Sequence, residues 1–140
     1  MSKNKTQELL RKVKQLEMTN NEKENKTMKL DFQNMEERHF ASFKGGEGEL
    51  LGRMHADELG KIMYGRLEPG STIGMHTHET SSEIIYILSG KADILYDDEN
   101  ELLEAGDCHY CPMGHSHSMR NLSNETLTFF AVVPEYGMTE

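Results

Sequence analysis

The sequence lacks long apolar runs and a secretory leader, and these absences exclude whole classes of protein. No apolar segment approaches the roughly 18 residues that a transmembrane helix needs, so we expect no contact with a membrane. The first ten residues, MSKNKTQELL, contain no apolar stretch of the kind that directs export. We therefore expect a cytoplasmic protein.

The sequence also lacks the excess of basic residues that a nucleic-acid-binding surface requires. Its 140 residues, enough for one domain of ordinary size, carry a net charge of −9. The charge is divided unevenly, because residues 1–29 have a net charge of +4 and residues 30–140 one of −13. We expect no nucleic-acid partner, and we place a boundary near Met28, between an arm of residues 1–28 and a domain of residues 29–140.

The arm is rich in Lys, Asn, Glu and Thr and contains no Gly, Pro or aromatic residue. This composition favours a disordered segment. The alternative is a short amphipathic helix, which would need a partner surface to be stable. The apolar residues that recur at helical spacing are Leu9, Leu10, Val13 and Leu16.

Cysteine is scarce, with Cys108 and Cys111 alone in the chain. If residues 106–112 form a strand, the two Cα atoms lie about 10 Å apart and the side chains face opposite sides. Because a disulfide needs Cα atoms within roughly 7 Å, we expect neither a disulfide nor a metal ion shared by this pair. Free thiols also fit a reducing cytosol.

From Phe40 onwards, short apolar segments alternate with turns that contain Gly, Pro or Asp. Their regular spacing predicts an all-β domain, either a barrel or a two-sheet sandwich, with an acidic hairpin tip at residues 97–100. The predicted strands are Phe40–Phe43, Glu49–His55, Lys61–Leu67, Ser71–Thr77, Ser82–Ser89, Lys91–Tyr96, Glu101–Glu104, Asp107–Tyr110, Ser116–Asn121 and Thr126–Val133.

The segment that follows Glu83, Ile-Ile-Tyr-Ile-Leu, is apolar on both faces of its predicted strand. A strand with one face in water should alternate, so we expect its outer face to be covered. We favour a homodimer, with Tyr86 facing the partner, over cover by residues 30–43 of the same chain.

A group of potential metal ligands is concentrated in two short segments. His76 and His78 are separated by one residue, so on a strand both point to the same face about 6.6 Å apart. Glu83 opens the next strand, and folding must bring His117 from a distant one. Three nitrogens, one oxygen and no thiolate suit one Mn, Fe, Co, Ni or Zn ion and disfavour Ca or Mg. An octahedral ion would keep two open positions for a ligand.

These residues fall into two motifs, and on them the chain resembles the cupin superfamily. The first motif reads Gly70, five residues, His76-Thr77-His78, four residues, Glu83, six residues and Gly90. The second reads Gly106, five residues, Pro112, one residue, Gly114, two residues, His117, three residues and Asn121. The resemblance implies a jelly-roll β-barrel over roughly residues 40–134, with a metal ion bound by His76, His78, Glu83 and His117.

Further residues are candidates for catalysis and substrate binding. His115 shares the strand parity of His117, so it is a candidate acid–base group, as is Tyr64. The alternative for His115 is an exposed position at the tip of the turn. Arg53 and Arg66 lie on strands that usually line a cupin pocket, where an arginine would suit a substrate carboxylate, and the alternative for both is a surface charge.

Two other sets of residues carry weaker signals. His109 lies on the strand that leads into the second motif, and we favour it less than His115 as an acid–base group. Five methionines are expected to fill the core: Met54, Met63, Met75, Met113 and Met119.

A metal with two open positions could chelate a small carboxylate or sugar acid and act as a Lewis acid. We therefore favour a metalloenzyme of non-oxidative type, an isomerase, lyase or decarboxylase. The alternatives are an Fe(II)-dependent dioxygenase and a module that only binds or senses a small ligand. The arm is too short for the helix-turn-helix of a DNA-binding regulator.

Overall fold

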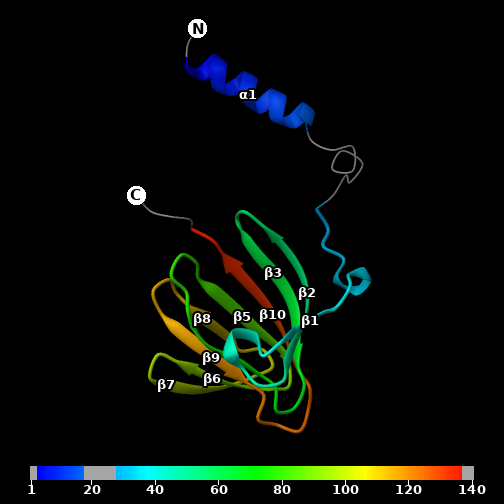
Figure 1. The fold of residues 1–140 in the computed structure, drawn as a ribbon, viewed down its shortest axis with the longest axis vertical. Helices are drawn as coiled ribbons and strands as arrows, with labels where there is room; N and C mark the ends of the chain where they lie inside the picture. The colour runs from blue at the N-terminus through cyan, green and yellow to red at the C-terminus, as the bar shows by residue number, and fades with distance from the viewer. Residues whose placement is uncertain (1–2, 18–27, 137–140) are drawn as a thin grey trace. The chain divides into compact units, whose positions relative to one another are not determined.

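A computed structural model describes residues 3–17 and 28–136 of the chain (Figure 1). The chain divides into two compact units, Met1–Leu30 and Asp31–Glu140, each considered by itself. The first contains helix α1 (Lys3–Glu17), in which Leu9 and Leu10 are exposed. Over residues 3–17 the helix is therefore observed instead of the disordered segment that the composition favours, whereas residues 18–27 of the arm lie outside the described residues. The exact domain bounds stay a prediction. Among the described residues, no helix is long and apolar enough to cross a bilayer.

The second unit is built almost entirely of strands, and each predicted strand overlaps an observed one. Two short 3-10 helices, η1 (Phe32–Asn34) and η2 (Phe43–Gly45), flank the first strand. The strands are β1 (Arg38–Ala41), β2 (Glu49–Asp57), β3 (Gly60–Leu67), β4 (Thr72–Thr77), β5 (Glu83–Ser89), β6 (Lys91–Tyr96), β7 (Glu99–Glu104), β8 (Cys108–Cys111), β9 (Ser116–Arg120) and β10 (Leu127–Pro134).

The strands form two antiparallel sheets around one core. The larger sheet has the order β1-β2-β3-β10-β5-β8 and the smaller one β4-β9-β6-β7. The core takes apolar side chains from both sheets, for example Leu67 and Phe129 from the larger and Ile94 from the smaller, all three fully buried. The two sheets therefore pack face to face. Of the two predicted architectures, this is the two-sheet sandwich, and it has the form of a jelly roll.

Three local expectations are corrected. The acidic hairpin tip is a turn of two residues, Asp97 and Asp98, because Tyr96 already pairs with Glu99. Asp97 has a positive φ of 49°, a conformation that Asp tolerates and that tight hairpins require. The expected core positions of Met75 and Met113 are wrong: both side chains are exposed, whereas Met63 and Met119 lie in the core.

The outer face of β5 carries exposed apolar side chains. Ile84, Tyr86 and Leu88 are each 38–43% exposed, so the rest of the described chain leaves this face largely open. The segment before β1 covers a different part of the same sheet, because Phe32 packs against the rings of Tyr64 on β3 and Phe130 on β10. Cover of β5 by residues 30–43 is therefore not what the fold provides.

Candidate metal centre

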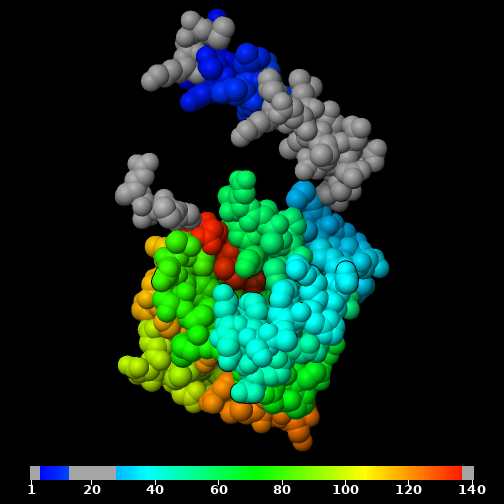
Figure 2. Space-filling view, viewed as in Figure 1, coloured from blue at the N-terminus to red at the C-terminus, as the bar shows by residue number. Residues whose placement is uncertain are grey.

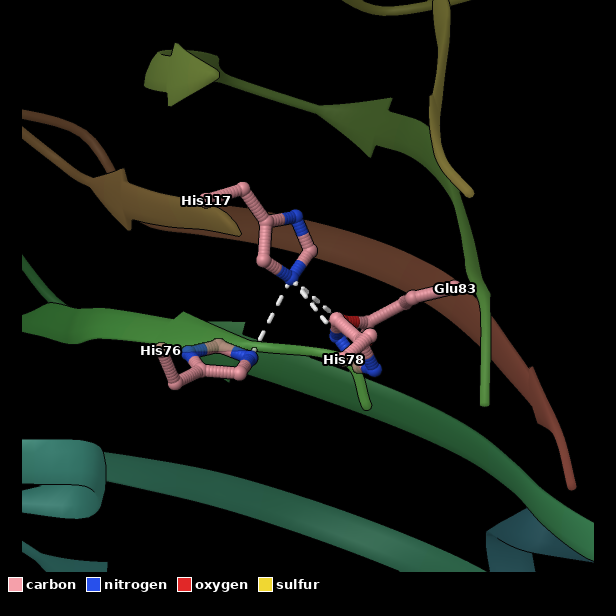
Figure 3. A group of neighbouring side chains, drawn as sticks. All are labelled: His76, His78, Glu83 and His117. Carbon is pink, nitrogen blue, oxygen red and sulfur yellow. Dashed lines mark hydrogen bonds and ion pairs between the residues drawn. The ribbon is translucent and has the colours of Figure 1, made fainter. Parts of the chain in front are cut away.

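The structure brings His76, His78, Glu83 and His117 to a common point inside the sandwich (Figure 3). The Nε2 atom of His117 lies 3.0 Å from Nε2 of His78 and 3.2 Å from Nε2 of His76. It lies 2.9 Å from Oε1 of Glu83, and Nε2 of His78 lies 3.3 Å from the same oxygen. Three imidazole nitrogens and one carboxylate oxygen thus converge from two sheets.

Strand pairing and a local irregularity explain this convergence. His76 on β4 and His117 on β9 are direct cross-strand partners, which places their side chains on one face of the smaller sheet. The register of this pair of strands shifts between Ile73 and His76, as expected for a bulge that redirects a side chain. Gly74 lies in this shift, and a Cβ atom there would come within 2.0 Å of the Lys44 carbonyl oxygen. Glycine therefore permits the close approach of η2 that accompanies the redirected His76.

The contacts on the far side of the ring orient two of the three histidines, His76 and His78, as ligands. Nδ1 of His76 lies 2.8 Å from the carbonyl oxygen of Gly74, which can only accept, so the proton of the neutral ring is on Nδ1. The Nε2 atom of His76 therefore presents a lone pair to the centre. Nδ1 of His78 lies 2.8 Å from the Ser81 hydroxyl. A single N–H at His117 could be directed to one of its three neighbours only, whereas one cation would serve all four donors.

The electrostatics of the centre point the same way. Burial alone would raise the pKa of Glu83, but hydrogen bonds from His117 and His78 lower it to about 2, so the carboxylate is ionised. Burial lowers the pKa of His76, which favours the neutral imidazole that a metal ion needs. A buried anion beside three imidazole rings is an arrangement that a divalent cation would stabilise. The donor set is compatible with one metal ion.

A cavity of about 390 Å³ adjoins the centre. His76, His78 and Glu83 form part of its wall. The wall also includes residues of the β2–β3 hairpin and of the end of β10. Figure 2 shows a hollow here, with the red end of β10 between green segments. The described residues that complete the lining are Phe43, Lys44, Met54, Asp57, Gly60, Lys61, Met63, Thr77, Glu79, Thr80, Ser81, Val133 and Glu135. The volume suits a small ligand.

The other candidate residues from the sequence have different partners. His115 stacks on Tyr96, and its Nδ1 lies 2.7 Å from a carboxylate oxygen of Asp97 at the hairpin tip. Tyr64 packs against Phe32 on the outer face of β3. Neither His115 nor Tyr64 is among the residues that line the cavity.

The two arginines also lie outside the lining. Arg53 donates to the carbonyl oxygens of Phe32 and Gln33, and Arg66 forms an ion pair of 2.7 Å with Glu37 and a second contact with Glu68. On β3, Met63 and Leu67 point into the core, so Arg66 points outward. Arg53 is the strand neighbour of Tyr64 and shares the outward face.

Two lysines that line the cavity were not found from the sequence. Lys61 has the parity of Met63 and Leu67 on β3, and this inward parity was the signal that could have found it. Lys44 comes from η2, where its positive φ of 55° belongs to an irregular turn that no sequence period predicts.

The family comparison agrees with the fold and the centre. The model of the Cupin domain matches residues 63–133, a range that includes both motifs and all four donors of the centre. The chain belongs to the cupin family. The all-β jelly-roll fold and the family resemblance inferred from the motifs are thereby confirmed.

Two of the similar proteins are named for oxalate. The chain is 34% identical over 100 residues to the oxalate-binding protein of Thermotoga maritima, covering 66% of this chain and 82% of that protein. It resembles the crystal structure of a predicted oxalate decarboxylase from Thermotoga maritima, with a TM-score of 0.73 and 28% identity, covering 77% of this chain and 99% of that one. It is also 33% identical over 94 residues to the quercetin 2,3-dioxygenase of Bacillus subtilis, covering 59% of this chain but only 28% of that protein.

Proposed function

We propose that this chain is a metal-dependent cupin that binds a small carboxylate of the oxalate type and converts it by non-oxidative chemistry, as a decarboxylase, lyase or isomerase. The observation that carries the proposal is the convergence of His76, His78, Glu83 and His117 on one point beside a cavity of about 390 Å³. Similarity to relatives named for oxalate binding and predicted oxalate decarboxylation supports the substrate class.

The four donors suit one divalent ion of Mn, Fe, Co, Ni or Zn. When bound, such an ion supplies a Lewis acid that polarises a substrate carboxylate or carbonyl. The protein side chains hold the site's geometry, because the Nδ1 contacts of His76 and His78 fix the orientation of both rings.

The lining residues have separate tasks in this proposal. Lys44 and Lys61 provide positive charge for a substrate carboxylate that extends into the cavity. Glu79 and Glu135 line the same cavity and are the candidates for carrying a proton to or from the substrate. His115, Tyr64, Arg53 and Arg66 keep no part in this proposal, since their partners lie elsewhere.

Two other functions are favoured by particular similarities. The relative named as an oxalate-binding protein favours a module that holds the ligand without turning it over. The similarity to quercetin 2,3-dioxygenase favours Fe(II)-dependent dioxygenation, although it spans a small part of that protein.

One experiment separates the three functions. Protein loaded in turn with Mn, Fe, Co, Ni and Zn is incubated with oxalate and with a panel of small carboxylates and sugar acids, with and without oxygen. We expect turnover of a small carboxylate that persists under strict anaerobiosis. Turnover only with iron and oxygen would support the dioxygenase, and saturable binding with no product would support the binding module.

We also propose that the chain forms a homodimer in the cytoplasm. The exposed apolar face of β5, with Ile84, Tyr86 and Leu88, is the surface that a second copy would cover, because such patches seldom stay in water. The free thiols of Cys108 and Cys111 suit a reducing compartment. Light scattering should give the mass of a dimer for the wild type and of a monomer for Tyr86→Glu; a monomeric wild type would contradict the proposal.

A further inference from the structure

A fourth interior histidine lies behind the metal centre and has no part in the function proposed above. His109 is on β8, with its side chain 4% exposed, and it does not line the cavity. Its Nε2 atom lies 3.0 Å from Nδ1 of His117. The other three donors of the centre face Nε2, the second nitrogen of the His117 ring. The two rings are stacked, with centroids 5.2 Å apart and planes inclined by 30°. The rings of His109 and Tyr96 also contact each other in an edge-to-face arrangement, with centroids 5.7 Å apart.

The proton positions follow once His117 is a ligand through Nε2. Its Nε2 lone pair is then directed to the metal, so the proton of the neutral ring is on Nδ1. The atom that faces this N–H is Nε2 of His109, which must accept the hydrogen bond and therefore carries its own proton on Nδ1. This hydrogen bond fixes the orientation of the His117 ring.

The other two histidine ligands are held in an equivalent way by different acceptors. His76 donates from Nδ1 to a main-chain carbonyl, that of Gly74, and Nδ1 of His78 contacts the Ser81 hydroxyl. Only for His117, among these three, is the partner of Nδ1 another imidazole. Because the partner, His109, acts through its side chain, its contribution to the orientation of His117 can be tested by substitution.

We propose that His109 is a positioning residue that fixes the tautomer and ring orientation of His117 by accepting its Nδ1–H bond. The inference rests on the proposed metal centre and assigns a task to a residue at one of the unspecified positions of the second motif. Partners of this kind in other metal sites typically contribute 10–100-fold in metal affinity.

A competing role for His109 is as a ligand of a second ion. One ring nitrogen each of His109 and His117 and the Sγ atom of Cys111 lie within 4.8 Å of one another. A second ion there would need Nδ1 of His117 as a ligand while Nε2 binds the first, which requires a ring without any proton. The single-ion arrangement requires only a neutral ring, and we favour it for that reason.

The test compares metal binding by the full chain carrying His109→Leu, His109→Gln or Cys111→Ser, with Co²⁺ as the probe. The Leu side chain removes the acceptor, whereas the Gln side chain keeps an amide oxygen near the position of Nε2. We expect Co²⁺ affinity to fall about 10–100-fold in His109→Leu, with a changed visible Co²⁺ spectrum, and to recover largely in His109→Gln. Cys111→Ser should bind one ion per chain as the wild type does.

Three results would overturn the proposal. Affinity and spectrum in His109→Leu equal to those of the wild type would show that the hydrogen bond does nothing for His117. Two ions per chain, with one lost in both His109→Leu and Cys111→Ser, would assign His109 to a second site. Unchanged Co²⁺ binding in His76→Ala as well would show that the proposed centre itself is wrong, which separates that failure from failure of the His109 inference. A Gln variant that folds with the far-ultraviolet spectrum of the wild type keeps the test valid even if the Leu variant does not fold.

Discussion

The outer histidines and the interior histidines of this protein differ in how many carboxylates they have. Each of the three outer histidines has its own carboxylate: His39 lies 3.2 Å from Glu49, His55 lies 3.0 Å from Asp57, and His115 lies 2.7 Å from Asp97. The interior histidines are His76, His78, His109 and His117, and the carboxylate among them is that of Glu83.

This difference separates two kinds of histidine chemistry. An outer pair is satisfied by one shared proton, because it has one nitrogen facing one carboxylate. At the interior centre, three nitrogens face each other and one oxygen, and a single proton satisfies only one contact. The number of nitrogen donors for each carboxylate, rather than the presence of histidine, is what distinguishes the interior group as a candidate metal site.

The largest expected effect is on metal binding, and it compares a substitution of one interior histidine with that of one outer histidine. His117→Ala should weaken metal binding by more than about 100-fold, because the loss of a ligand costs more than the loss of a residue that only supports a ligand. His39→Ala should leave metal binding unchanged. Isothermal titration with Mn²⁺ or Co²⁺ measures both. Equal losses in the two variants would mean that the ion binds somewhere other than the interior group.

The second prediction compares the carboxylates. Saturating metal should raise the thermal midpoint of the wild type and of Asp97→Asn, but hardly that of Glu83→Gln, because only Glu83 is in the centre. An ion present at 100 times its Kd stabilises the folded state by about 2.7 kcal/mol. Differential scanning calorimetry with and without metal provides the measurement, and a full metal-dependent rise in Glu83→Gln would contradict the account.

The third prediction extends the comparison to the lysines. Lys44→Gln and Lys61→Gln should each weaken oxalate binding to the metal-loaded protein by about tenfold, since a charge-assisted hydrogen bond contributes about 1.5 kcal/mol. Lys91→Gln, a change outside the cavity lining, serves as the control. If all three variants bind oxalate as the wild type does, the ligand does not extend into this cavity.

The smallest effect is expected at an outer pair. The hydrogen bond from His115 lowers the pKa of Asp97 below its usual 3.8, so this pair stabilises the fold above that pH and ceases to do so as the pH falls through the lowered value. His115→Ala should therefore reduce the thermal midpoint slightly at about pH 5, and the difference should shrink at about pH 3. A difference that grows on acidification would contradict the assigned partner.

The strands and the three donors of the first motif were accessible from the sequence because both depend on short-range spacing. His76 and His78 must share a strand face whatever the rest of the fold, and the glycine and proline turns delimit each strand. The family resemblance then supplied the long-range pairing that brings His117 beside His76, which spacing alone does not provide.

The remaining features depend on tertiary contacts that no local pattern carries. The outward direction of Arg66 and the partners of Arg53 follow from strand parity together with the way η1 lies over the larger sheet. The exposure of Met75 follows from the register shift in β4, and the role proposed for His109 depends on the packing of β8 against β9. Each of these is a property of neighbours distant in sequence.

The most direct test of the central claim is the metal content of the purified chain. Metal-free protein is reconstituted in turn with Mn, Fe, Co, Ni and Zn, passed through a desalting column and assayed by mass spectrometry for each element. The account predicts about one ion per chain for at least one of these metals, and close to none in His76→Ala and His117→Ala. Protein that retains none of the five metals, or variants that retain as much as the wild type, would contradict it.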